Sequence, residues 1–273
     1  MRVFVSVDIE GIAGVAGREE GSQGNPEYER ARRLMTGEAS AVVRGVYTVD
    51  AEAEVTVADA HGTFRNIIPE LLDPRARLVR GKPRSLAMIE GVQDGFDAAI
   101  FVGYHGRAGT GDSVLSHTFT GTLADVHING TSFGEIGLNA AVAGLYGAPL
   151  VLVTGDASVA AEVEELLPGT RTTVVKRGIG ALAADSLHPE RSCQLIEASV
   201  ADVLRQGLQI APFVVDGPVE LEVDVSIPAY ADQAMVVPGI RRIAGRTLGY
   251  DAPDYLTAYR ITRLIGALSG LPL

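Results

Sequence analysis

Short apolar blocks alternate along the chain with longer stretches in which apolar residues recur at helical spacing. The blocks are of strand length and rich in β-branched residues, and they cover residues 3–7, 55–58, 98–102, 150–153 and 172–175. Continuous apolar runs of this kind, separated by helical patterns, are typical of a parallel sheet that is buried on both faces. The pattern therefore predicts an α/β fold in three layers, with a mainly parallel sheet covered by helices.

The helical patterns cover residues 25–47, 134–146, 157–167, 189–206 and 253–269. In each of them apolar residues recur every three to four positions, which places them on one face of a helix. The first pattern opens with Asn25, Pro26 and Glu27, a combination typical of a helix start. We expect Asn25 to cap a helix that ends near Tyr47.

One feature of the sequence predicts that the sheet is mixed, and a second divides the chain into two parts. Alternating residues between 114 and 128 lead into Asn129 and Gly130, which favour a tight turn between antiparallel strands. Prolines and a turn at 211–218 then precede a strand predicted at 219–225. We expect a catalytic α/β domain at 1–210 and a small C-terminal α+β portion at 211–273.

Three of the predicted strands end in residues of metal-ligand type followed by a glycine: Asp8 with Glu10, His61, and His105. The carboxyl ends of parallel strands lie along one edge of a sheet, and ligands bind at that edge. Alternation in an extended segment also points Asp8 and Glu10 to the same side. We therefore expect these four side chains to converge.

Glu135 supplies a further acid at the start of a predicted helix. Carboxylates combined with imidazoles, without thiolates, are typical ligands of a catalytic zinc or a related divalent ion. Five such residues suit two ions that share Asp8, and two neighbouring ions can activate water and polarise a substrate carbonyl. Taken singly, each residue also has a structural interpretation, because acids after strands cap helices and single histidines are often structural.

Four segments in order resemble the DppA-type zinc D-aminopeptidases. They are SVDIEGI at 6–12, GYHGRA at 103–108, LSH at 115–117 and GEIGLNA at 134–140. The order of the motifs and the chain length match that family, and the likeness extends over roughly the first two-thirds of the chain.

The resemblance implies two zinc ions per chain, with Asp8 as the bridge and Glu10, His61, His105 and Glu135 as the other ligands. It also implies a catalytic role for His117, whose other interpretation is a half-buried structural residue in a strand. The implied reaction is hydrolysis of the N-terminal residue of short peptides, especially D-amino-acid peptides such as D-Ala-D-Ala. The resemblance further implies a ring-like homo-oligomer, a decamer, whose sites face an inner channel.

Two other functions remain open from the residues. Residues 130–134 read Gly-Thr-Ser-Phe-Gly, which fits the nucleophile motif G-x-S-x-G, so Ser132 with His188 predicts a metal-free serine hydrolase. The turn at Asn129 and Gly130 disfavours that motif geometry. A non-catalytic metal-binding protein is the second alternative, although structural zinc sites are usually rich in thiolates.

Composition and charge limit the kinds of binding partner and the cellular compartment that we expect. The formal net charge of −11 disfavours nucleic acid and anionic membranes, and no apolar run approaches the roughly 20 residues of a membrane-spanning helix. The single cysteine, Cys193, excludes an intrachain disulfide and suits a reducing compartment. The start of the chain does not resemble a signal peptide, so we expect a cytoplasmic protein. Lys82 and Arg84 are interpreted as solvated charges.

Overall fold

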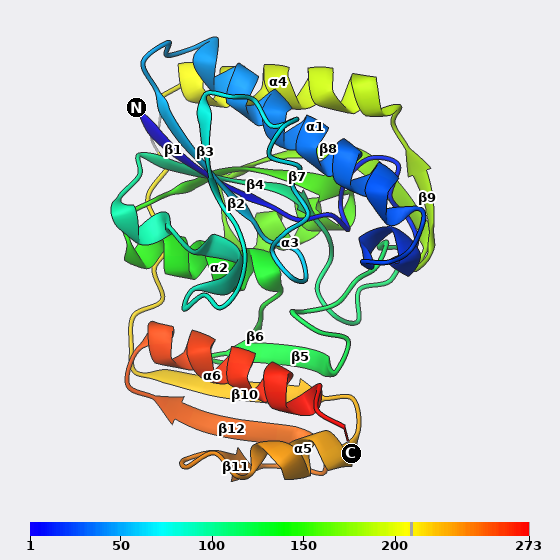
Figure 1. Cartoon of the computed structure of the whole chain (residues 1–273). Coiled ribbons are helices and arrows are strands. Elements are labelled where there is room, and N and C mark those ends of the chain that lie inside the picture. Colours follow the sequence, from blue (N-terminus) through cyan, green and yellow to red (C-terminus); the bar gives the residue numbers. More distant parts are fainter. Residues whose placement is uncertain (208–209, 273) are drawn as a thin grey trace.

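The computed structural model describes residues 1–207 and 210–272. Its main sheet contains seven strands: β1 (Arg2–Val7), β2 (Glu54–Asp59), β3 (Ala76–Val79), β4 (Ala98–Tyr104), β7 (Leu150–Asp156), β8 (Arg171–Gly180) and β9 (Ala183–Ser186). They lie in the order β3-β2-β1-β4-β7-β8-β9 (Figure 1). Neighbouring strands are parallel except β8 and β9, which are antiparallel. The predicted mixed, mainly parallel sheet is confirmed.

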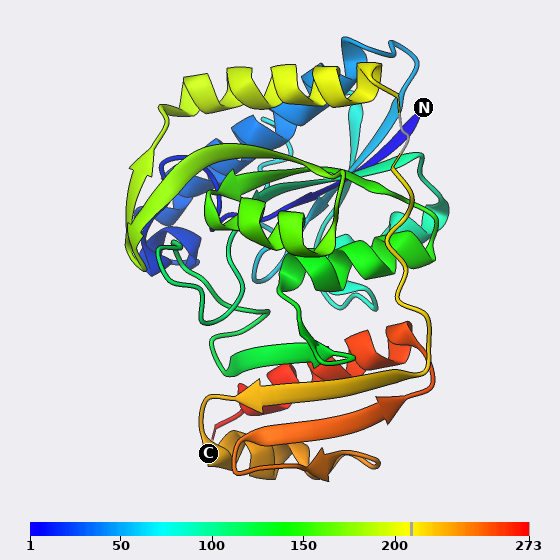
Figure 2. The same ribbon diagram turned by 180° about the vertical axis from the view of Figure 1, so that it is seen from behind.

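Helices cover both faces of this sheet, as Figures 1 and 2 show. One face carries α1 (Tyr28–Tyr47) and α4 (Pro189–Arg205), and the other carries α2 (Glu135–Leu145) and α3 (Ser158–Leu166). Successive side chains of a strand point to opposite faces, so Val3 and Val5 enter the core that also holds residues of α1 and α4, while Phe4 enters the other core. Burial on both faces explains why the strands read as continuous apolar blocks.

A second, smaller sheet lies below the main domain in Figure 1. Its five strands are antiparallel in the order β11-β12-β10-β5-β6, with bounds β5 (Leu123–Ile128), β6 (Thr131–Ser132), β10 (Val219–Val225), β11 (Arg241–Arg242) and β12 (Thr247–Ala252). Two helices, α5 (Pro228–Ala234) and α6 (Tyr255–Ser269), accompany it, and α6 packs between this sheet and α2. Short 3-10 helices occur at η1 (Arg18–Gly21), η2 (Ala87–Ile89) and η3 (Val92–Asp94). Across the described residues, no helix combines the length and the apolar character needed to cross a membrane.

The chain enters the second sheet twice. Strands β5 and β6 come from the middle of the chain, and β10 to β12 come from its end. One apolar core also contains both Phe101 of the main sheet and Val223 and Leu248 of the second sheet. The division at residue 210 stays a prediction, and any domain boundary has to account for this return of the chain.

The predicted elements are found with two corrections. Asn129 and Gly130 form the expected turn between β5 and β6, with φ of 51° and 80°. The strand predicted from residue 114 is wrong before residue 123, because Leu115 and Phe119 have φ of 56° and 59°, and non-glycine residues in the left-handed region interrupt an extended segment. Helix α1 begins at Tyr28 rather than after Asn25, whose side chain donates to the Ser22 carbonyl.

Candidate metal centre

The order in which the chain adds strands to the main sheet reverses between β1 and β4. The chain adds β2 and β3 on one side of β1 and then returns to add β4 on the other side. A switch of this kind opens a crevice outside the carboxyl ends of the two strands, where α/β proteins bind ligands. Asp8 directly follows β1 and His105 directly follows β4, so both residues lie at this crevice.

Two glycines allow the loops after these strands to touch. The Gly11 amide donates to the Gly103 carbonyl at 2.7 Å. A Cβ atom on Gly11 would lie 2.0 Å from the Tyr104 carbonyl oxygen, and one on Gly103 would lie 2.3 Å from the Asp8 carbonyl oxygen. Gly103 also has a φ of 68°, which favours glycine. Gly11 and Gly103 therefore allow close backbone contact between the loops that carry Asp8, Glu10 and His105.

The five residues predicted as metal ligands come together. The two carboxylate oxygens of Asp8 face different histidines: Oδ1 lies 3.1 Å from His61 Nδ1, and Oδ2 lies 3.5 Å from His105 Nε2. Glu10 Oε2 lies 2.6 Å from His61 Nδ1, and Glu135 Oε2 lies 3.7 Å from His105 Nε2. Residues from four separate segments of the chain thus form one cluster, which is the convergence expected from the strand ends.

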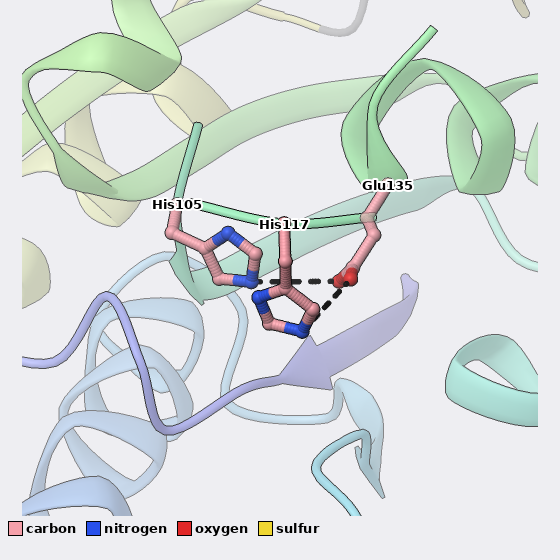
Figure 3. Close-up of side chains that lie close together, drawn as sticks. All are labelled: His105, His117 and Glu135. Atoms are coloured by element: carbon pink, nitrogen blue, oxygen red, sulfur yellow. Dashed lines mark ion pairs between the residues drawn. The ribbon is translucent and has the colours of Figure 1, made fainter. Parts of the chain in front are cut away.

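His117 joins this cluster from the loop before β5 (Figure 3). Its Nε2 lies 3.6 Å from Glu135 Oε1 and 4.0 Å from Glu10 Oε1. The His117 and His105 rings are stacked, with centroids 4.4 Å apart. Ligand atoms of His105, His117 and Glu135 lie within 4.8 Å of one another. The position of His117 therefore suits a metal ligand as well as a group that acts on substrate.

Each of the three imidazoles is held by a backbone carbonyl. The pairs are His61 Nε2 with Gly21 O at 2.8 Å, His105 Nδ1 with Gly106 O at 3.0 Å, and His117 Nδ1 with Leu115 O at 2.8 Å. A carbonyl oxygen only accepts, so the bonded nitrogen carries the proton and the other nitrogen of a neutral ring keeps its lone pair. In all three rings the other nitrogen faces the carboxylates, as in many metal-binding histidines.

Burial and opposite charge shift the pKa values of this cluster in opposite directions. Burial lowers the pKa of His105, but the charges of Glu135 and Asp8 outweigh it and raise this pKa to about 10. Burial likewise raises the pKa of Asp8, yet its interactions with His105 and His61 hold this pKa well below its usual range. The buried carboxylates thus require nearby positive charge, which protonated imidazoles or a bound cation supplies.

Two buried atoms in the cluster lack the hydrogen bond that burial normally demands. Within the described residues, His105 Nε2 and Glu10 Oε2 form none, and the short contact of Glu10 with His61 lacks hydrogen-bond geometry. Ligand atoms of Asp8, Glu10 and His105 lie within 4.8 Å of one another. Such convergence of partnerless nitrogen and oxygen atoms fits a divalent cation, and the donor set fits the zinc predicted from the sequence.

Lys176, in β8, supports the site but was missed in the sequence. Its buried ammonium donates to the carbonyl oxygens of Glu10, Ile12 and, at 2.6 Å, Val15. Burial lowers the pKa of Lys176 to about 8. The sequence does contain a signal for this role. A lysine directly follows the apolar block at 172–175, and a buried strand rarely carries a charged side chain. Lys176 thus fixes the loop that carries Glu10.

Two cavities meet at the cluster, and Glu10, His61 and His117 line both of them. The larger cavity has a volume of about 610 Å³ and mainly apolar walls. The smaller cavity has a volume of about 300 Å³ and carries two cations, Lys82 and Arg263. A small molecule can therefore reach the carboxylates and imidazoles from both sides.

The serine-hydrolase alternative receives no support from this geometry. Ser132 Oγ donates to Asp125 Oδ1 at 2.5 Å, and no histidine bonds to it in the described part of the chain. His188 instead caps α4 by accepting from the Glu190 amide. Cys193 is half-buried in α4, and burial raises the pKa of its thiol to about 11, which disfavours a nucleophilic thiolate.

Known proteins resemble this chain along almost its whole length. The peptidase M55 family model, described as D-aminopeptidase, matches residues 1–264. A D-aminopeptidase of Bacillus subtilis (strain 168) is 34% identical over 261 residues, which cover 95% of this chain and 94% of that protein. A solved structure described as the Zn-dependent D-aminopeptidase DppA from Bacillus subtilis, a self-compartmentalizing protease, superposes with a TM-score of 0.95 at 34% identity and covers 98% of both chains. The chain belongs to the M55 family of D-aminopeptidases.

Proposed function

We propose that this chain is a zinc-dependent aminopeptidase that removes the N-terminal residue of short D-amino-acid peptides such as D-Ala-D-Ala. The observation that carries the proposal is the position of Asp8, whose two oxygens face different histidines in a buried cluster beside two cavities. Membership of the M55 family and the zinc dependence of the Bacillus subtilis relative support it. The predicted enzyme class agrees with the family.

Two zinc ions per chain fit the arrangement, with Asp8 as the shared ligand. Glu10 and His61 lie on the side of Asp8 Oδ1 and would hold one ion, whereas His105 and Glu135 lie on the side of Oδ2 and would hold the other. Bound zinc supplies Lewis acidity, which lowers the pKa of water and polarises a carbonyl group. The backbone carbonyls behind His61 and His105 keep the required lone pairs aimed at the site.

His117 is proposed as the catalytic group rather than a ligand. Its side chain is 25% exposed, against 1% for that of His105, so a substrate can reach it. The hydrogen bond to the Leu115 carbonyl fixes Nδ1 and leaves Nε2 facing the centre. From this position a neutral imidazole accepts a proton from the attacking water and returns one to the departing amine.

Self-association into a ring-like decamer is proposed for this chain as well. The Bacillus subtilis relative is described as a self-compartmentalizing protease. In the single chain, Ile179 in β8 and Leu182 in the turn before β9 are 70% and 60% exposed, and Leu182 also lines the larger cavity. Large exposed apolar side chains beside a site are typical of an interface. Light scattering should give ten times the mass of one chain, and a monomeric mass would contradict the ring.

Hydrolysis of matched D-Ala-D-Ala and L-Ala-L-Ala, with zinc quantified before and after chelation, tests the proposed function. We expect cleavage of the D-peptide, loss of activity on chelation, recovery with zinc, and about two zinc ions per chain. Cleavage that ignores the chelator would favour Ser132. Bound zinc without cleavage of either peptide would favour a non-catalytic metal-binding protein.

A further inference from the structure

The smaller cavity is lined by groups of both charges. Carboxylates of the candidate metal centre, such as Asp8 and Glu135, line it together with the cations Lys82 and Arg263. Apolar side chains, among them Phe64, Met88 and Phe119, complete the lining. The cavity thus suits a small ligand that carries both a group for the metal centre and an anion.

The two cations have contacts but no acidic partner. Among residues 1–207 and 210–272, no carboxylate forms an ion pair with Lys82 or Arg263. Arg263 Nη1 donates to the Ser85 carbonyl at 3.0 Å, and the Lys82 ammonium lies 5.0 Å from the centre of the Phe64 ring. An aromatic face and a carbonyl hold a cation in place without neutralising its charge.

Positive charges lie close together around Lys82. Burial and the positive charges of Arg263 and Arg84 lower the pKa of Lys82. Arg84 itself is directed elsewhere, since it donates to the Asp59 and Ala87 carbonyls. Neighbouring cations in a partly buried cavity repel one another, and a bound anion relieves this repulsion.

We propose that Lys82 and Arg263 bind the C-terminal carboxylate of the peptide substrate. This inference rests on the proposed aminopeptidase function and names the substrate class, which is dipeptides and similarly short peptides with a free carboxyl group. Arginine matches a carboxylate with two parallel N–H donors, and lysine adds a point charge. Lys82 is exposed in the single chain, as the sequence-based interpretation of a solvated charge expects, and on this proposal it also serves a ligand.

The cation pair sets the direction of the proposed substrate. Because Lys82 and Arg263 line the cavity of about 300 Å³, the departing residue with its carboxylate would lie there, which leaves the cavity of about 610 Å³ for the N-terminal residue. A cation pair in the same cavity as the candidate ligands limits how much chain fits between the two. Peptides whose carboxylate lies farther from the scissile bond therefore lose this interaction.

The experiment compares kcat/KM for D-Ala-D-Ala and for its C-terminal amide, which lacks the negative charge. Charge-assisted hydrogen bonds predict that the wild-type chain prefers the acid by about 10- to 100-fold. Lys82→Met and Arg263→Met should each remove most of this preference by slowing cleavage of the acid much more than cleavage of the amide. Arg80→Met and Arg260→Met are matched controls, because both arginines are exposed and line neither cavity.

Equal cleavage of acid and amide by the wild-type chain would overturn the inference and leave the aminopeptidase intact. A preference that survives in both Lys82→Met and Arg263→Met would also overturn it. If neither peptide is cleaved, the proposed function fails, and calorimetry of the zinc-loaded chain with N-acetyl-D-alanine and its amide decides the carboxylate site. Selective binding of the acid that is lost in these two variants and kept in the two controls supports the site, and any other binding result refutes it.

Discussion

Two regions beside the main sheet accommodate their buried acids differently. In the candidate metal centre, Asp8, Glu10 and Glu135 converge with three histidines at the meeting point of two cavities. Glu38, in α1, is equally buried but stands apart and lines neither cavity. Its Oε1 accepts from the Ala13 amide at 3.0 Å and from Ser192 Oγ at 2.6 Å.

A candidate functional acid differs from a structural one in the groups that surround it. Burial raises the pKa of Glu38 to about 7, so this carboxyl can take up a proton and avoid an unpaired buried charge. The metal-centre acids instead face imidazoles whose lone pairs are fixed toward them. Convergence on a cavity, rather than burial, therefore marks the candidate site.

The largest expected effect comes from Asp8→Ala. This change removes the ligand shared by both proposed ions, so zinc content should fall from about two ions to none and kcat/KM by at least about 10³-fold. Zinc analysis and D-Ala-D-Ala hydrolysis measure both quantities. Glu38→Gln serves as the control and should keep zinc and activity. Normal turnover in Asp8→Ala would refute the shared-ligand role.

His117→Ala should separate catalysis from metal binding. With the ligands intact, zinc content should stay at the wild-type level while kcat falls by about 10²- to 10⁴-fold, because the proton-transfer group is gone. His105→Ala should lose zinc as well as activity. If His117→Ala also loses zinc, the residue is a ligand, as its distance from Glu135 equally permits.

Lys176→Met should weaken the site without removing any ligand side chain. The carbonyl oxygens of Glu10, Ile12 and Val15 would lose their common donor, and the loop carrying Glu10 would be less well placed. We expect about 10- to 100-fold weaker zinc binding in a titration against a competing chelator. Unchanged zinc affinity in a variant with native circular dichroism would exclude this positioning role.

Glu38→Gln should leave activity unchanged but alter the pH dependence of stability. The folded pKa of Glu38 lies above the ordinary value of 4.5, so the folded state holds this proton more tightly than the unfolded state. The free energy of unfolding of the wild-type chain should therefore fall as the pH rises from 4.5 through about 7. Glu38 accounts for roughly 3 kcal/mol of this decrease. Urea unfolding at pH 5 and pH 8 should show that the stability of the variant, relative to that of the wild type, is greater at pH 8 than at pH 5. The same difference at both pH values would contradict the account.

Much of the fold and of the cluster could be predicted because the signals are local. Apolar blocks such as residues 3–7 define the buried strands, and the residues that follow them fall at one sheet edge by the geometry of parallel strands. The loop carrying His117 was mistaken for a strand, since alternation at 114–122 gives no sign of the left-handed residues Leu115 and Phe119.

Residues with distant partners escaped prediction for a different reason. Lys176 contacts carbonyl groups more than 160 positions away, and the cavity that joins Lys82 to Arg263 brings together the loop after β3 and helix α6. A charge in a sequence shows neither its burial nor its partners. Only the packed chain shows that these two cations line the same cavity as the candidate metal ligands.

Diffraction at the zinc absorption edge from crystals of the zinc-loaded protein would show whether two ions share Asp8. Two anomalous peaks are expected, one between Asp8 and His61 and the other between Asp8 and His105. A single peak, or peaks away from Asp8, would refute the shared two-ion centre.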